Sequence, residues 1–328
     1  MTGASARLPG DSLTDSRAAR SLRASARGDR IFQILITTFA LAIPALLVVI
    51  AISILLAAWP ALSTAGFSFL TGSTWDVSRG EFGAAPAIYG TVVSSILALL
   101  LATPLALGVS IFLSEIAPPW VRQPIGFLVD LLAAIPSVVY GLWGIFVLIP
   151  VLRDPVGPFL SETLGLGRTP LFSGPNYGYS MFSAGVILAI MILPFIAAVT
   201  REVLLAVPRS QRDAALALGA TRWEMIRDAV LPYARSGIIG GIILGLGRAL
   251  GETMAVTMLI GNRPEISASL FAPGYTMASL IANEFTEATN DAHISALMAV
   301  GAVLFGVTLI VNALARWLVW RVTKGGVR

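Results

Sequence analysis

Long stretches without a charged residue constrain this chain more than any other feature. Four such windows occur, at residues 31–75, 82–114, 131–150 and 169–200. Each can hold at least one membrane-spanning helix of about 20 residues. Two further spans are expected at 236–262 and 294–322, and Pro60 is expected to end the first span near residue 59. The chain is therefore predicted to be an all-α polytopic membrane protein with six transmembrane helices.

Composition supports this class. Of the 328 residues, 56% are hydrophobic and 12% are charged, against about 25% charged in soluble domains. There is no cysteine and only one histidine, His293, expected in an external loop, so disulfides, thiolate chemistry and a His/Cys metal site are excluded. Residues 1–30 carry six arginines without an apolar core, which predicts a flexible basic tail rather than a signal peptide. Residues 31–325 form the transmembrane domain.

The basic residues indicate an orientation. With six spans, seventeen Lys and Arg residues fall on one side and four on the other, and Arg248 alone lies within a span. By the positive-inside rule, the tail, the loop after the fourth span and the C-terminal end are cytoplasmic. Since orientation accounts for the positive charge, no nucleic-acid partner is expected.

Two features of the third span, Pro136 and Asp130, each allow a structural and a functional interpretation. Pro136 frees a backbone carbonyl one turn back, which a membrane tolerates only where protein or water satisfies it. The segment Ile135–Gly141 is thus either a packing kink or a point of ligand contact. Asp130 lies near the expected cytoplasmic end, where a carboxylate is solvated or paired rather than part of a proton relay.

The loop after the fourth span, about residues 208–235, has the pattern of two short helices. Ser210 can cap the first helix and Gly219 can end it. Thr221 and Glu224 have the spacing of a capping box for the second helix, which Pro232 is expected to terminate. The loop is predicted to project from the membrane as a compact helical element.

Within this loop, the residue pattern resembles the EAA loop of ABC-importer permeases. The positions that match are Ala214, Ala215, Gly219, Leu231 and Pro232, with Asp213 in place of the glutamate and Ala229 in place of the isoleucine. The resemblance implies a coupling helix that inserts into a groove of an ATPase.

Two charged residues, Arg248 and Glu252, lie inside the fifth expected span. An ionised side chain near the bilayer centre costs about 2.5–3.5 kcal/mol on insertion scales, so it is kept for a partner, a hydrated pathway or a ligand. Together with Gly237, Gly241 and Gly245, the pair forms one face of a helix. These glycines either allow close helix packing or leave room beside Arg248 for an anion.

The chemistry of the pair suits an oxyanion. Arg248 offers a planar fork of donors that matches the oxygens of a tetrahedral anion. Glu252 either holds Arg248 through an i, i+4 pair or accepts a hydrogen bond from a protonated substrate oxygen, which phosphate has and sulfate lacks. An ion pair that serves only assembly is the alternative.

Three strings, Gly245–Val256, Ile260–Asn262 and Ile135–Gly141, resemble the C-type permeases of the phosphate-specific transport (Pst) family, and the likeness covers about residues 31–325. The resemblance implies a type I ABC importer permease that moves phosphate by alternating access in a bacterial plasma membrane. The family's role in transport carries over to Arg248 and Glu252. Gly241 and Gly245 are also expected in the substrate path, because glycines leave room beside Arg248.

The same resemblance implies partners. These are a second permease (PstA-like), two ATPase subunits (PstB-like), an extracytoplasmic phosphate-binding protein (PstS-like) and the lipid bilayer. The sole lysine, Lys324, does not follow a glycine-rich loop, so the chain has no Walker A motif. No cofactor is expected in this chain, because ATP and Mg would be bound by the separate ATPase.

The alternatives to a phosphate permease are a permease for another oxyanion, an intramembrane enzyme and a gated channel. A permease for molybdate, sulfate or phosphonate would share the loop pattern, although not the string around Arg248. An intramembrane enzyme would need a nucleophile with a base, a metal site or a Gly-x-Ser-x-Gly elbow, and the chain offers none of these. A gated channel would need no ATPase. The chain is therefore expected to be a transporter subunit without a catalytic site.

Overall fold

The computed structural model describes residues 11–324 of the chain. These residues are almost wholly helical. The only sheet among them is an antiparallel hairpin of β1 (Trp75–Asp76) and β2 (Glu81–Phe82), in which Trp75 pairs with Phe82. The all-α prediction is confirmed. The chain divides after Ile54 into two units, which are described separately.

Helix α1 (Asp11–Ala65) contains that division. Its candidate membrane span, Asp29–Ala65, is longer than predicted, because Pro60 does not end the helix. A proline removes one N–H and can be accommodated as a local defect. The helix ends before Gly66, whose φ of +56° breaks the helical path. Of the predicted tail, residues 1–10 lie outside the described residues, and α1 begins at Asp11.

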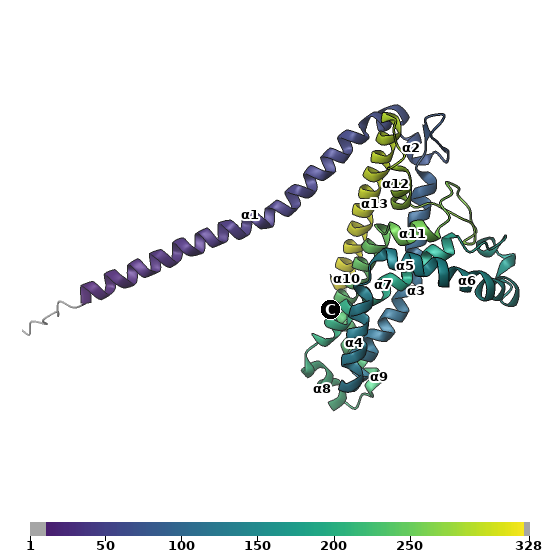
Figure 1. Cartoon of the computed structure of the whole chain (residues 1–328). Coiled ribbons are helices and arrows are strands. Elements are labelled where there is room, and N and C mark those ends of the chain that lie inside the picture. Colours follow the sequence, from purple (N-terminus) through teal and green to yellow (C-terminus); the bar gives the residue numbers. More distant parts are fainter. Residues whose placement is uncertain (1–10, 325–328) are drawn as a thin grey trace, which may run out of the picture. The chain divides into compact units, whose positions relative to one another are not determined.

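The second unit contains the remaining elements in chain order, coloured along the sequence in Figure 1. The first half comprises α2 (Ser68–Thr71), the hairpin, α3 (Ala85–Ile111), η1 (Phe112–Ile116), α4 (Pro119–Ala133), α5 (Ser137–Trp143), η2 (Gly144–Leu148), α6 (Ile149–Val151), η3 (Leu152–Val156), η4 (Phe159–Thr163), η5 (Leu166–Arg168) and η6 (Pro170–Phe172). The second half comprises α7 (Met181–Leu205), α8 (Arg209–Ala217), α9 (Arg222–Glu224), η7 (Met225–Val230), α10 (Leu231–Leu250), α11 (Met254–Leu259), α12 (Met277–Glu284) and α13 (Asp291–Lys324).

Helix α7 is the centre of this unit. It packs against α3, α4, α5, α10 and α11, and it is the most deeply buried of the candidate spans. Small side chains on α3, including Ala98 and Ala102, meet larger ones on α7, including Leu188 and Ile192, in the main hydrophobic core. Interlocking small and large side chains gives the close packing on which folded interiors depend. These five helices are therefore positioned by their contacts with α7.

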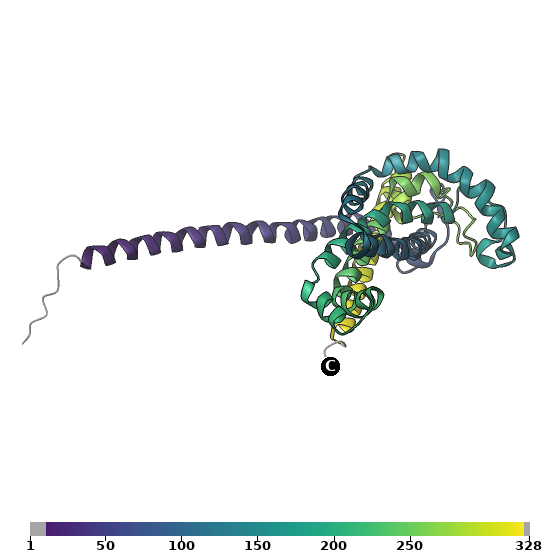
Figure 2. The ribbon, with the colours of Figure 1, turned by 90° about the horizontal axis from the view of Figure 1, so that it is seen from below.

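The two ends of the unit differ in their elements. Helices α8 and α9 lie at one end, whereas α2 and α12 lie at the other (Figure 1). Figure 2 shows the segment from α5 to η4 as a curved helical arc along the side of the unit. Three wide π-helical turns, η2, η3 and η4, interrupt the α-helix along this arc.

Six helical stretches among the described residues are long and apolar enough to cross a membrane, which confirms the predicted number. Two of them are displaced from their expected positions. The third is Ser137–Thr163 rather than 131–150, and the fifth is Arg222–Leu250 rather than 236–262. Pro136 breaks the helix before the third span, and the turn at Gly251 ends the fifth span at Leu250.

Pro136 separates α4 from α5, so the expected kink is a complete break between two helices. The carbonyl of Leu132, one turn before the proline, accepts the hydroxyl of Tyr140 at 2.8 Å. It also accepts the N–H of Ile135 at 3.3 Å. Because protein groups satisfy this carbonyl, the structure supports the packing interpretation of the segment.

His293 lies in the first turn of α13 and is buried, which corrects its expected place in an external loop. Its Nε2 is 2.8 Å from Oε2 of Glu284, and the indole N–H of Trp75 donates to the same oxygen at 2.7 Å. The ring of Phe82 stacks on the imidazole, with centroids 5.7 Å apart. These contacts fix the β-hairpin to α12 and α13.

Candidate functional site

Arg248 and Glu252 lie on opposite sides of a helix break. Helix α10 ends at Leu250 and α11 begins at Met254. In the turn between them, the N–H of Gly251 donates to the carbonyl of Gly247 across a long distance of 3.4 Å. The helical hydrogen bonding is therefore weak at this point. Glycine disfavours a continued helix and permits a tight turn. The prediction of one continuous span over 236–262 was therefore wrong.

Arg248 occupies the last turn of α10 and is exposed. A cation is favoured at this end of a helix, where the carbonyl dipoles converge. Within residues 11–324, the side chain of Arg248 forms no hydrogen bond and no ion pair, so the i, i+4 pair with Glu252, one of the two alternatives for that carboxylate, is not made.

Glu252 is held by α11 instead. Its Oε1 accepts the backbone N–H of Ala255 at 3.3 Å, as a capping carboxylate does in the first turn of a helix. The other carboxylate oxygen, Oε2, forms no hydrogen bond to any described residue. The break thus presents one arginine fork and one carboxylate oxygen that the described chain does not occupy.

The glycines of α10 pack against α7. A Cβ added at Gly245 would lie 2.6 Å from Cγ1 of Ile196, and one added at Gly237 would lie 2.4 Å from Cγ1 of Val203. Gly241 is also buried against α7. Of the two interpretations of this stripe, the structure supports close helix packing. A role for Gly241 and Gly245 in a substrate path stays a prediction.

A second face of α10 is not packed against other described residues. A Cβ added at Gly240 or Gly247 would meet no atom within 4 Å. Tyr233 and Leu244 are exposed on the same face. This face therefore has room for another helix, which no described residue supplies.

The segment Ile135–Gly141 and the segment after Arg248 pack directly on each other. A Cβ at Gly141 would lie 2.4 Å from Sδ of Met258, and one at Gly144 would lie 2.7 Å from Cδ2 of Leu259. The close contact of α5 and η2 with α11 depends on these two glycines. Two strings that are far apart in the sequence therefore form one structural unit around the helix break.

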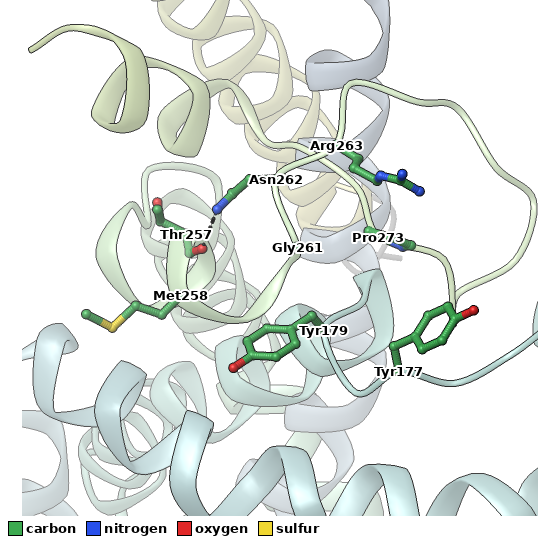
Figure 3. Close-up of a pocket in the computed structure, with 8 residues that line it drawn as sticks. All are labelled: Tyr177, Tyr179, Thr257, Met258, Gly261, Asn262, Arg263 and Pro273. Atoms are coloured by element: carbon green, nitrogen blue, oxygen red, sulfur yellow. Dashed lines mark hydrogen bonds between the residues drawn. The ribbon is translucent and has the colours of Figure 1, made fainter. Parts of the chain in front are cut away.

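An open cavity of about 480 Å³ lies beyond the other end of α11 (Figure 3). Its described lining includes Tyr177, Tyr179 and Arg263, and Arg263 is its only charged residue. In Figure 3 the amide of Asn262 turns toward Thr257, whose carbonyl it reaches at 2.8 Å. Neither Arg248 nor Glu252 lines this cavity.

The loop after the fourth span forms the two expected helical segments. Gly219 has a φ of +87°, which confirms that it ends α8. Thr221 and Glu224 form the expected capping box at α9. Ser210 is not the cap of α8, because the helix begins one residue earlier, at Arg209.

Pro232 does not end the second helix of the loop. Residues 222–250 form one continuous helix through α9, η7 and α10. A proline in a helix lacks an N–H and clashes with the carbonyl four residues before it. Here the wide π-helical turn η7 ends two residues before the proline and accommodates it. The loop is thereby joined rigidly to the fifth span.

The residues predicted to contact an ATPase lie on or beside this projection. Asp213 and Ala214 on α8 are exposed, as are Gly219 and Pro232, whereas Ala215 and Leu231 are half-buried. Sequence reasoning missed the apolar tip of the loop. Leu218 is 90% exposed and Trp223 is 62% exposed. Large apolar side chains at such a position indicate a contact surface, and their place beside the Gly219 turn was the available signal.

Asp130 is paired, as expected for a carboxylate near the end of a span. Its Oδ2 lies 3.5 Å from Nη2 of Arg201, on α7, which also contacts Glu202 at 3.0 Å. The side chain of Asp130 is 52% exposed. This pair links α4 to α7 between a half-exposed carboxylate and an arginine whose side chain is 16% exposed.

Comparison with known proteins identifies the family. Residues 106–324 match the family model described as "Binding-protein-dependent transport system inner membrane component". A protein of Mesorhizobium japonicum named "Phosphate transport system permease protein PstC" is 48% identical over 92% of this chain and 93% of its own length. A protein of the same name from Xylella fastidiosa is 46% identical over 95% and 96%. "PstC 2" of Mycobacterium tuberculosis is 42% identical over 91% and 94%.

Solved structures share the fold. A chain of a bacterial alginate ABC transporter aligns with a TM-score of 0.57 at 19% identity, covering 87% of this chain and 94% of that chain. A chain of the inward-facing MetNI methionine ABC transporter aligns with a TM-score of 0.54 at 18% identity, covering 72% and 94%. This chain belongs to the family of binding-protein-dependent transport system inner membrane components, and within it to the PstC permeases.

Proposed function

We propose that this chain is the permease subunit of an ATP-driven importer that carries inorganic phosphate across the inner membrane by alternating access. The observation that carries the proposal is Arg248, an exposed arginine at a helix break that no described residue pairs. Relatives that are 42–48% identical over more than nine tenths of the chain are named phosphate permeases, which supports phosphate as the substrate.

Phosphate contact follows from the chemistry of the break. The guanidinium of Arg248 would bind two phosphate oxygens in a bidentate arrangement. The free Oε2 of Glu252 would accept a hydrogen bond from a protonated phosphate oxygen. Sulfate carries no proton near neutral pH, so the carboxylate would repel it. The two side chains together would then select phosphate.

Energy for transport would reach the permease through α8. The exposed tip at Leu218 and Trp223, together with Asp213, would dock on a separate PstB-like ATPase that binds ATP and Mg. Movement of this tip would pass into the fifth span, because α9, η7 and α10 form one helix. Arg248 is in the last turn of that helix, so the ATPase contact and the substrate contact share one rigid element.

The orientation follows from the basic residues. The end that carries α8 would face the cytoplasm, with both chain termini on that side. The opposite end, with the β-hairpin and α12, would receive a PstS-like binding protein. The open face of α10 at Gly240 and Gly247 would pack against a PstA-like second permease.

The test is uptake of radiolabelled phosphate by the complete complex in proteoliposomes that contain ATP. Unlabelled phosphate should compete with the label, whereas sulfate, molybdate and phosphonate at the same concentration should leave uptake nearly unchanged. Omission of ATP should abolish uptake. Inhibition by sulfate but not by phosphate, or uptake that is indifferent to ATP, would reject the proposed function.

A further inference from the structure

Arg212, on α8, forms the most extensive side-chain contact at this end of the unit. Its Nε donates to Oε2 of Glu115 at 3.0 Å, and its Nη2 donates to Oε1 of the same residue at 2.7 Å. Nη2 also donates to the carbonyl of Leu204 at 2.9 Å, and Nη1 donates to the carbonyl of Val207. One guanidinium therefore binds three parts of the chain.

These three parts belong to different elements. Glu115 lies in η1, which continues α3. Leu204 is in the last turn of α7, and Val207 follows that helix directly. Helix α8 buries none of its own residues, and its apolar attachment rests on the half-buried Ala215. The fork of Arg212 is therefore the main connection from α8 to α3 and α7.

Burial of the carboxylate separates this pair from the pairs of Arg201 with Asp130 and Glu202, in which the arginine is 16% exposed but the carboxylates are 52% and 67% exposed. The side chain of Glu115 is 4% exposed and that of Arg212 is 17% exposed. By contrast, Arg227 and Asp228 on η7 are 60% and 56% exposed. Exposed pairs contribute about 0–1 kcal/mol, whereas removing one partner of a buried pair leaves an uncompensated charge. The hydrogen bond to the Glu115 carboxylate also raises the pKa of the Arg212 guanidinium.

We propose that the Arg212–Glu115 pair is a strut that makes α8 move together with α3 and α7, and that both residues are positioning residues for the coupling of ATP hydrolysis to transport. The inference rests on the proposed function. A bidentate fork resists rotation as well as separation, so it transmits displacement in more than one direction. The continuous helix 222–250 provides a second connection, to the fifth span alone.

The test uses the complete complex and two variants of the pair. Glu115→Gln removes the charge while keeping the side-chain shape, and Arg212→Lys keeps the charge while losing the fork. In both variants, phosphate transported per ATP hydrolysed should fall about 10-fold, within the range of coupling between sites. ATP hydrolysis and co-purification with the ATPase should persist. Asp228→Asn, which breaks an exposed pair at the same end, should leave the ratio unchanged.

A second readout does not depend on the substrate. The chain has no cysteine, so spin labels can be placed cleanly at Ser210→Cys on α8 and Leu105→Cys on α3, both exposed positions. With Glu115 and Arg212 intact, the distance between the labels should be the same with and without an ATP analogue. In Glu115→Gln, the analogue should change it.

The outcomes separate the strut from the proposed function. A native complex that moves no phosphate would reject the function, and the labels would still report on the strut. The strut would be overturned by an unchanged transport ratio in both assembled variants, or by a label distance that varies in the native complex. Loss of the ATPase from both variants would also overturn it, because the pair would then serve assembly only.

Discussion

Within the described residues, Arg212 with Glu115 and Arg248 with Glu252 are two arginine–glutamate combinations that are arranged in opposite ways. The side chain of Glu115 is buried, that of Arg212 is partly buried, and two hydrogen bonds join them. Arg248 and Glu252 are closer in sequence, yet Arg248 is exposed and Glu252 bonds to α11. Proximity in sequence therefore says little about pairing. The bonded pair, Arg212 and Glu115, is called the closed pair and is suited to transmitting movement. Arg248 and Glu252, which do not bond to each other, are called the open pair and are suited to binding a ligand.

The helix break explains the difference. If 236–262 were one helix, Arg248 and Glu252 would be neighbours on one face and could neutralise each other. The turn at Gly251 separates them and gives each a helix end of favourable sign. Their charges are thus stabilised by dipoles rather than by one another. An anion can then bind Arg248 without first displacing a carboxylate.

The largest expected effect comes from replacing Arg248, the arginine of the open pair. Arg248→Gln should lower phosphate uptake about 100-fold or more, because it removes two charge-assisted hydrogen bonds of about 1.5–3 kcal/mol each. Assembly of the complex should persist, since no described residue depends on this side chain for a hydrogen bond. Radiolabelled uptake and co-purification measure the two quantities.

A matched control is Arg168→Gln, at an exposed arginine in η5 that also forms no ion pair among the described residues. It should leave uptake unchanged. If Arg248→Gln retained uptake, or if it dissociated the complex, an ion pair that serves assembly would be the better account of Arg248.

A smaller effect should separate the two roles of Glu252. Glu252→Ala removes the acceptor of the Ala255 N–H in the first turn of α11 and should cost about 1 kcal/mol of stability. Glu252→Gln keeps a side-chain oxygen that can accept the N–H of Ala255, so its thermal unfolding in detergent should stay close to that of the native chain. An equal loss of stability in both variants would mean that the charge matters to the fold, as in a closed pair with Arg248.

Much of the fold was predictable because hydropathy and turn chemistry are local. The number of spans, the end of α8 at Gly219 and the capping box at Thr221 follow from patterns of a few residues. The exact spans were not predictable. Pro60 and Pro232 suggested ends that the structure does not have, since neighbouring backbone adjusts around a proline.

The site was predictable in its residues but not in its geometry. Periodicity placed Arg248 and Glu252 on one helical face, which assumed that the helix continues through Gly251. The strut was invisible in the sequence, because Glu115 and Arg212 are 97 residues apart and meet only through the packing of α3 on α7. The exposure of Leu218 and Trp223 could not be predicted either, because it depends on tertiary structure.

The most direct measurement is a structure of the complete complex trapped with phosphate and a non-hydrolysable ATP analogue. We expect a phosphate whose oxygens lie about 3 Å from the guanidinium of Arg248, with Glu252 beside a protonated oxygen. A guanidinium bound instead to a carboxylate of this chain or of the second permease, with phosphate elsewhere along the path, would contradict this expectation.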